Sequence, residues 1–112
     1  MFSAYQTTIL CHQSPKVLEQ IMADAVDWYL SLHPTVFPIE RTNSYIVLKA
    51  CKSYRSNGEL ITVSVQPYSF NIVSKSLEDS IQLIAWGKNR DNVISLSGCL
   101  RSQVKELLCA AA

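Results

Sequence analysis

Apolar residues recur with a helical period between Ser14-Pro15 and His33-Pro34. Serine is favoured as an N-cap and proline at the first helical position, whereas the residue before a proline is pushed out of the helical region. These signals predict a helix between Ser14 and His33. Its apolar face would carry Leu18, Ile21, Met22, Ala25, Trp28, Tyr29 and Leu32.

A second stretch with this period follows Trp86-Gly87-Lys88-Asn89-Arg90-Asp91-Asn92, which we interpret as a junction between strand and helix. We predict a long helix from about Asn89 to about Cys109. Gly98 would lie inside it at a cost of about 1 kcal/mol relative to alanine. Either a close neighbour or a tolerant surface position would explain that glycine. The predicted buried stripe is Val93, Leu96, Leu100, Val104 and Leu107, widened by Ile94 and Leu108.

The stretches between these helices are typical of strands, because they are rich in β-branched and aromatic residues or alternate with period two. Asn57-Gly58 favours a hairpin turn. Tyr45–Tyr54 carries apolar residues on both faces, which indicates a central strand. In Glu59–Gln66 the inward residues would be Ile61, Val63 and Val65. The predicted strands are Ser3–His12, a short piece at Thr35–Ile39 broken by Pro38, Tyr45–Tyr54, Glu59–Gln66, Phe70–Ser76 and Ile81–Trp86, with turns at 40–44, 67–69 and 77–80.

The order of elements is strand, helix, three or four antiparallel strands, helix. This order predicts an α+β fold in which one curved antiparallel sheet carries two helices on one face. The 112 residues are too few for two cores, so we expect a single domain over residues 1–112.

Composition favours a folded, soluble domain. Apolar residues make up 48% of the chain and charged residues 17%, the reverse of a disordered composition. Ten basic and nine acidic residues give a net charge of +1, without the basic excess of a nucleic-acid-binding domain. The longest apolar run, Tyr45–Leu48, is far short of the roughly 20 residues that span a bilayer.

The four cysteines, Cys11, Cys51, Cys99 and Cys109, contain no C-x-x-C pair. With no export signal at the N-terminus, we expect reduced thiols and a cytoplasmic location. Zinc ligands could be drawn from Cys11, His12, Cys51 and Cys99, but no local pair has ligand spacing, so we expect no metal and no cofactor.

No set of residues predicts catalysis. Cys11 and His12 are adjacent in a predicted strand, so their side chains point to opposite faces. Asp24 and Asp27 lie on a polar helical face that is typical of solvent exposure. The ending Cys109-Ala110-Ala111-Ala112 matches a prenylation pattern, but no polybasic run precedes it, and a frayed helix end is the simpler interpretation.

The order of elements resembles the helix-grip and TATA-binding-protein-like arrangements, in which a curved antiparallel sheet wraps a long C-terminal helix. The stretch from Ser74-Lys75-Ser76 to Trp86-Gly87-Lys88-Asn89 is similar to the strand-to-helix junction of small uncharacterised bacterial domains that carry Asp-Trp-Gly-Lys-Asn. Here Ala85 replaces the aspartate. The resemblance implies a fold and transfers no catalytic residue.

A sheet that faces an amphipathic helix can leave a cleft for a small apolar molecule. The candidate lining residues are Trp28, Tyr29, Tyr45, Phe70 and Trp86, which would otherwise fill the core. The alternative function is a structural or interaction module that forms a homodimer, since low charge and strand edges favour pairing.

A second candidate site is an anion site at the expected start of the last helix. Free N–H groups in a first helical turn bind anions, and Gly87, Lys88, Asn89 and Arg90 would surround such a ligand. A plain solvated helix cap is the alternative.

Overall fold

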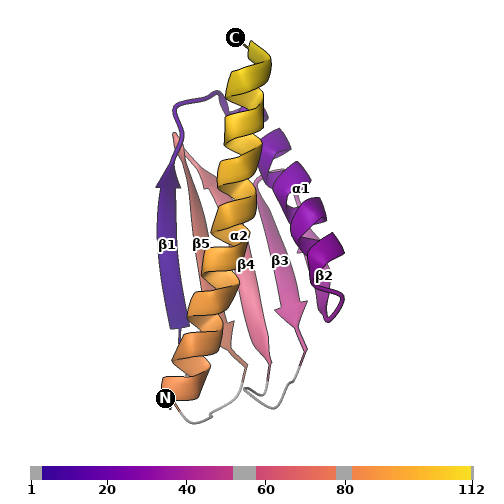
Figure 1. Cartoon of the computed structure of the whole chain (residues 1–112), viewed down its shortest axis with the longest axis vertical. Coiled ribbons are helices and arrows are strands. Elements are labelled where there is room, and N and C mark those ends of the chain that lie inside the picture. The colour runs from indigo at the N-terminus through magenta and orange to yellow at the C-terminus, as the bar shows by residue number, and fades with distance from the viewer. Residues whose placement is uncertain (1–3, 52–57, 78–81, 112) are drawn as a thin grey trace.

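The computed structural model describes residues 4–51, 58–77 and 82–111, and within the last range it describes the side chains of residues 87–109. Five strands and two helices follow one another along these residues, and both helices lie on one face of the sheet (Figure 1). The elements are β1 (Ala4–Leu10), α1 (Pro15–Leu32), β2 (Val36–Arg41), β3 (Tyr45–Ala50), β4 (Glu59–Gln66), β5 (Ser69–Ser76) and α2 (Gln82–Ala111). The predicted α+β class and the placement of both helices are confirmed.

The strands form one antiparallel sheet in the order β1-β5-β4-β3-β2. β4 and β5 form a hairpin in which Gln66 pairs with Ser69, so Pro67 and Tyr68 alone make the turn. Tyr68 adopts a φ of 57°, in the left-handed region. β1 pairs with β5, which places the first and last strands side by side and leaves β1 and β2 as the two edges.

α1 begins as predicted. Ser14 is the N-cap and accepts a hydrogen bond from the N–H of Val17, and Pro15 occupies the first helical position. The helix ends at Leu32, and His33 is its C-cap. The expected apolar face is confirmed except at Trp28 and Leu32, which are 41% and 57% exposed. Val26, absent from the predicted face, is buried instead.

The prediction was wrong about the start of α2. Residues 82–86 belong to this helix, so the strand expected at Ile81–Trp86 does not form there; Ile81 itself lies outside the described residues. A short apolar run bounded by polar residues fits a buried helical segment as well as a strand, and periodicity alone does not separate them. Gly87 consequently lies inside the helix and does not mark a junction.

α2 crosses the sheet, and its last turns rise past the ends of the strands (Figure 1). Val93, Leu96 and Leu100 are buried as predicted, and Val104 packs against the core. Leu107 was wrongly predicted in this stripe, and Ile94 and Leu108 were wrongly predicted to widen it, since they are 36%, 49% and 56% exposed. Beyond Leu100 the helix runs out of sheet to cover, which explains why its apolar residues there stay accessible.

The strand predictions need smaller corrections. β2 extends to Arg41, two residues into the expected turn, and a β-bulge lies between Pro38 and Glu40. β3 ends at Ala50; of the residues expected to extend it, Cys51 has left the strand and the remainder lie outside the described residues. β3 is an inner strand, as its two-sided pattern indicated.

Gly58 has a φ of 106°, as a turn glycine should, while Asn57 lies outside the described residues. The turn expected at 77–80 reaches the described chain only at Leu77, which lies in a bend after β5.

Candidate functional site

Of the five aromatic residues expected to line a cleft, the four whose side chains the structure describes do not gather around one space. Tyr29 and Phe70 are 1% and 0% exposed and belong to the hydrophobic core. Trp28 lies at the surface of α1. Tyr45 is half-buried on the sheet face opposite the helices, because the neighbouring residue in the strand points toward them. The side chain of Trp86 lies outside the described part of the chain.

The space beneath the middle of α2 is filled by apolar side chains. Phe70 and Ile72 of β5 lie on the same side of the sheet as Leu96 and Leu100 of α2, and all four are 0% exposed. Close packing of apolar side chains is ordinary for a protein core. In the described chain, the centre of the interface between sheet and helix therefore serves stability.

The premise of the anion site was wrong. Because α2 begins at Gln82, Gly87, Lys88, Asn89 and Arg90 lie within the helix and not at its first turn. Their backbone N–H groups are at positions where helical hydrogen bonding is already established. Asn89 is fully buried and faces the sheet.

At the end of the core where β4 begins and β5 ends, the packing becomes polar. Asn92 Nδ2 donates to Glu59 Oε1 at 2.8 Å and to Ser74 Oγ at 3.3 Å. Ser74 Oγ donates to Asn89 Oδ1 at 2.7 Å, and Asn89 Nδ2 donates to Ser76 Oγ at 3.1 Å. We call Glu59, Ser74, Ser76, Asn89 and Asn92 the polar network; each is less than 9% exposed. It fixes α2, through Asn89 and Asn92, to β4 and β5.

Sequence reasoning missed this network, although a signal was present. Glu59 lies two residues before Ile61 and so continues the inward face of its strand, and Ser74 continues the face of Phe70 and Ile72. Asn89 extends the helical stripe of Val93 backward by one turn. Polar residues that continue an apolar stripe point into the core. That inference requires the correct start of the helix.

Two rings stack at the end of α1, Tyr29 within the helix and His33 at its C-cap. Their rings stack with centroids 4.3 Å apart and an interplanar angle of 27°. Burial, with smaller contributions from Cys99 and Glu59, raises the pKa of Tyr29 far above its usual range. Burial and the charge of Lys88 lower the pKa of His33. At neutral pH these shifts favour a protonated phenol and a neutral imidazole.

The buried thiols lack the features of a nucleophile. Burial raises the pKa of both Cys11 and Cys99, which keeps them protonated at neutral pH. Reactive cysteines show the opposite shift, produced by a nearby cation or a helix N-terminus. The four cysteines are free, and Cys109 is exposed.

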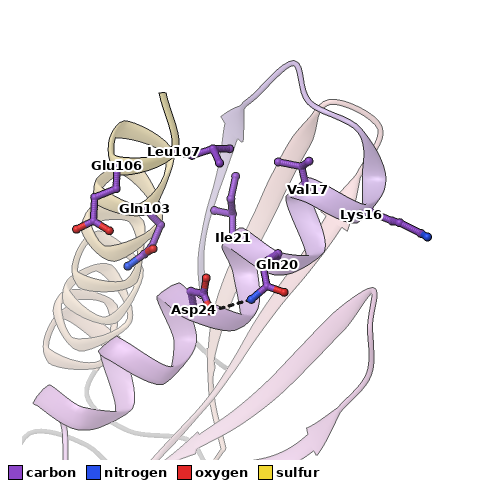
Figure 2. A pocket seen from close by; sticks show the side chains of 8 residues that line it. All are labelled: Lys16, Val17, Gln20, Ile21, Asp24, Gln103, Glu106 and Leu107. Atoms are coloured by element: carbon purple, nitrogen blue, oxygen red, sulfur yellow. Dashed lines mark hydrogen bonds between the residues drawn. The ribbon is translucent and has the colours of Figure 1, made fainter. Parts of the chain in front are cut away.

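An open pocket lies between α1 and the projecting end of α2 (Figure 2). We call it the inter-helix groove; its volume is about 420 Å³. Val17 and Ile21 of α1 and Leu107 of α2 form its apolar floor. Its polar rim consists of Lys16, Gln20, Asp24, Gln103 and Glu106.

Two larger pockets also border α1: the lining of one is mainly polar and charged, and the other draws much of its lining from connecting segments. One of about 520 Å³ is closed by Thr42 and Asn43 after β2, and the other, of about 560 Å³, by Gln13, Pro67 and Tyr68. The lining of the inter-helix groove comes from two helices that pack on the same core. Sites built on regular elements hold their shape better than sites built on loops. The inter-helix groove is therefore the stronger candidate.

Within the described residues, neither helix has the length and apolar content to cross a membrane. In that part of the chain no group of three or more His, Cys, Asp or Glu side chains is placed to hold a metal ion.

No protein-family model and no curated protein matches the sequence. Among solved structures, the chain is similar to the ZhuI aromatase/cyclase of Streptomyces sp. R1128, with a TM-score of 0.57 and 9% identity over 100% of this chain and 99% of that one. It is also similar to Ara h 8.0201, with a TM-score of 0.53 and 8% identity over 97% of this chain and 99% of that one. At such identities the likeness shows the fold alone: the chain has a helix-grip-like α+β architecture.

Proposed function

We propose that this domain binds a small, mainly apolar molecule in the inter-helix groove. The observation that carries the proposal is the groove itself, an open space of about 420 Å³ whose floor is apolar and formed by both helices. Ligand pockets of roughly 300–1,000 Å³ with apolar linings and few polar groups are typical of small-molecule sites. An aromatase/cyclase among the structural neighbours is consistent with small-molecule binding on this fold, although no residue is carried over.

Ligand binding in the groove would also account for the exposure of an apolar side chain of α2. Leu107 is 36% exposed and faces Val17 and Ile21 across the gap between the helices (Figure 2). An apolar molecule in this gap would cover these side chains and remove them from water. Each square ångström of apolar surface so buried contributes about 25 cal/mol.

Octanol is a suitable first probe because it is neutral and has a flexible apolar tail. On titration followed by amide NMR spectra, we expect shifts at residues 17–24 and 103–107. Leu107→Asp should weaken binding about fivefold or more, since it places a charge on the apolar floor. Leu108→Asp is the matched control: Leu108 is the next residue and is exposed, but it does not line the groove. Unchanged spectra up to the solubility limit of octanol would refute the proposal.

A homodimer is the second candidate function. It is supported by Phe37 and Ile39 of the edge strand β2, which are 51% and 56% exposed. Pairing through the strand edge itself is disfavoured, because Pro38 lacks an N–H group and the bulge interrupts the ladder. Side-chain packing would have to hold such a dimer together. Sedimentation equilibrium tests this, and a Phe37→Ser, Ile39→Ser variant that sediments like the parent chain would count against it.

A further inference from the structure

We propose that β1 pairs in antiparallel orientation with β1 of a second copy of this chain, so that the two sheets join into one. The surface is the outer edge of β1, which the proposed ligand binding does not use. It lies at the opposite side of the sheet from Phe37 and Ile39 of β2. Figure 1 shows β1 as the outermost strand on that side, with both helices on the face of the sheet.

The two edges of the sheet differ in their protection against pairing. β2 carries Pro38, a bulge between Pro38 and Glu40, and the charged residues Glu40 and Arg41. Proline, bulges and charges each hinder the addition of another strand. β1 has the sequence Ala-Tyr-Gln-Thr-Thr-Ile-Leu, which contains no proline and no charge, and its register against β5 is uninterrupted. β1 is therefore the edge at which a further strand can be added.

The register identifies the backbone groups that β1 presents at this edge. The N–H of Cys11 donates to the C=O of Tyr68 at 2.9 Å, and these two residues continue the register of β1 and β5 by one pair. In an antiparallel ladder, hydrogen-bonded pairs alternate with pairs that are not hydrogen-bonded. The odd-numbered residues of β1 therefore bond to β5, and the N–H and C=O groups of Gln6, Thr8 and Leu10 point outward.

The strand is complementary to itself, which favours a second copy as its partner. With a two-fold axis at Thr7, the whole of β1 overlaps with its counterpart, and Gln6 lies opposite Thr8 of the second copy as a hydrogen-bonded pair. Outward backbone groups then meet only outward groups. Tyr5 lies opposite Ile9 of the second copy, and such pairs of an aromatic and a β-branched residue stabilise sheets. Because β1 is uncharged, this pairing opposes no like charges.

The same register covers an exposed apolar side chain. Leu10 is 74% exposed, and in the dimer it lies opposite Ala4 of the second copy. A two-fold axis perpendicular to the sheet keeps the helices of both copies on one face, so both layers continue across the interface. α2 packs against β1 and β5, and α2 of each copy would flank the joined strands.

Charges placed at one opposed pair test both the interface and its register. Gln6→Lys with Thr8→Lys puts like charges opposite each other across the two-fold axis, whereas Gln6→Lys with Thr8→Glu puts opposite charges there. The second variant is the matched control for the first, because both lose the hydrogen bonds that Gln6 and Thr8 donate to Asn71.

Sedimentation equilibrium of the full chain measures dimer formation, in a concentration series up to about 500 µM because pairing through one strand buries a small interface. The parent chain should dimerise in this range. The dissociation constant should rise about tenfold or more in the variant with like charges, since the opposed pair occurs twice, and stay within about threefold of the parent value in the other.

Amide hydrogen exchange gives a second measurement, which depends on the alternation along β1. The amides of Gln6, Thr8 and Leu10 should be more strongly protected at high protein concentration than at low concentration. The amides of Thr7 and Ile9 should be protected at both, because they bond to β5 within one chain.

A parent chain that stays monomeric throughout the series overturns the inference, as do equal dissociation constants in the two variants. A dimer lost only in the Phe37→Ser, Ile39→Ser variant would assign the interface to β2 instead. Octanol should bind equally to both β1 variants, since neither substituted residue lines the inter-helix groove. If octanol does not bind but the dimer behaves as expected, the proposed ligand binding fails and this inference stands.

Discussion

At the scale of single residues, the polar network shows how a few hydrogen bonds position a helix. Glu59 is a carboxylate with no exposed surface, and Asn92 gives it a hydrogen bond from α2. A buried carboxylate is tolerated only where donors replace the water that it loses. Asn92 thus offsets part of the cost of burying Glu59, and the same amide group fixes the rotation of the helix.

Asn92→Ala is expected to lower the free energy of unfolding by about 2–3 kcal/mol, because it removes a donor from a buried carboxylate and leaves a small void. Urea denaturation followed by circular dichroism measures the change. Asn43→Ala, at an exposed position between β2 and β3, should change stability by less than about 0.5 kcal/mol. Equal losses in the two variants would show that the network is unimportant.

His33 is expected to make stability depend on pH. Its pKa in the folded chain is below 6.5 because of burial and Lys88, so at pH values just below 6.5 the unfolded chain binds the extra proton. The free energy of unfolding should therefore be at its full value above pH 6.5 and fall as the pH decreases through that point.

Unfolding in urea at several pH values between 5 and 8 tests this dependence. His33→Gln should flatten the curve in this window. His12→Gln, which alters an exposed histidine after β1, is the matched control. If His33→Gln leaves the curve unchanged, the folded environment of His33 does not disfavour its charged form.

At the scale of elements, α2 packs one face of its middle turns on the core and leaves its last described turns exposed. The patch Ser97-Gly98-Cys99 illustrates the distinction, since Ser97 and Cys99 are buried and Gly98 is exposed. No described atom lies within 4 Å of the position that a Cβ at Gly98 would occupy. Of the two explanations for this glycine, the structure supports the tolerant surface position.

Gly98→Ala is expected to raise the free energy of unfolding by about 0.5–1 kcal/mol, because alanine loses less conformational entropy in a helix and meets no neighbour. Thermal and urea denaturation measure this gain. The converse change at the exposed neighbouring position, Ser95→Gly, should lower stability. A loss of stability in Gly98→Ala would indicate a contact that the structure does not contain.

At the scale of the whole molecule, the position of each strand in the sheet determines which backbone hydrogen bonds open first. β4 lies in the middle of the sheet and is covered by the helices, whereas β2 lies at an edge with a bulge in its ladder. The molecule is elongated, with extents of 46 × 24 × 22 Å, and much of the end of α2 lies in solvent.

Hydrogen exchange should reflect this arrangement. Amides of Ile61, Val63 and Ile72 are expected to exchange slowest, at free energies close to that of global unfolding, and those of Phe37 and Glu106 at least tenfold faster. NMR-detected exchange into deuterium oxide resolves these amides individually. Protection of Phe37 equal to that of Val63 would contradict the edge role of β2 and would instead support a dimer through that strand.

The sequence by itself determined the elements whose signals are local. The first helix follows from Ser14-Pro15 and His33-Pro34, because caps and prolines act on the residues beside them. The inward faces of β4 and β5 follow from alternation, because successive side chains of a strand point to opposite faces. The α+β class follows from the order of these elements.

Only the tertiary structure decided where α2 begins and what its faces meet. The run at 82–86 has no local property that separates a strand from a helical segment, and the structure places it in α2. That choice moved Gly87, Lys88, Asn89 and Arg90 from a helix end to a helix interior, and it brought Asn92 against Glu59. The inter-helix groove could not be predicted from the sequence either. Ile21 and Leu107 are far apart along the chain, and they line one groove only because both helices pack on the same sheet.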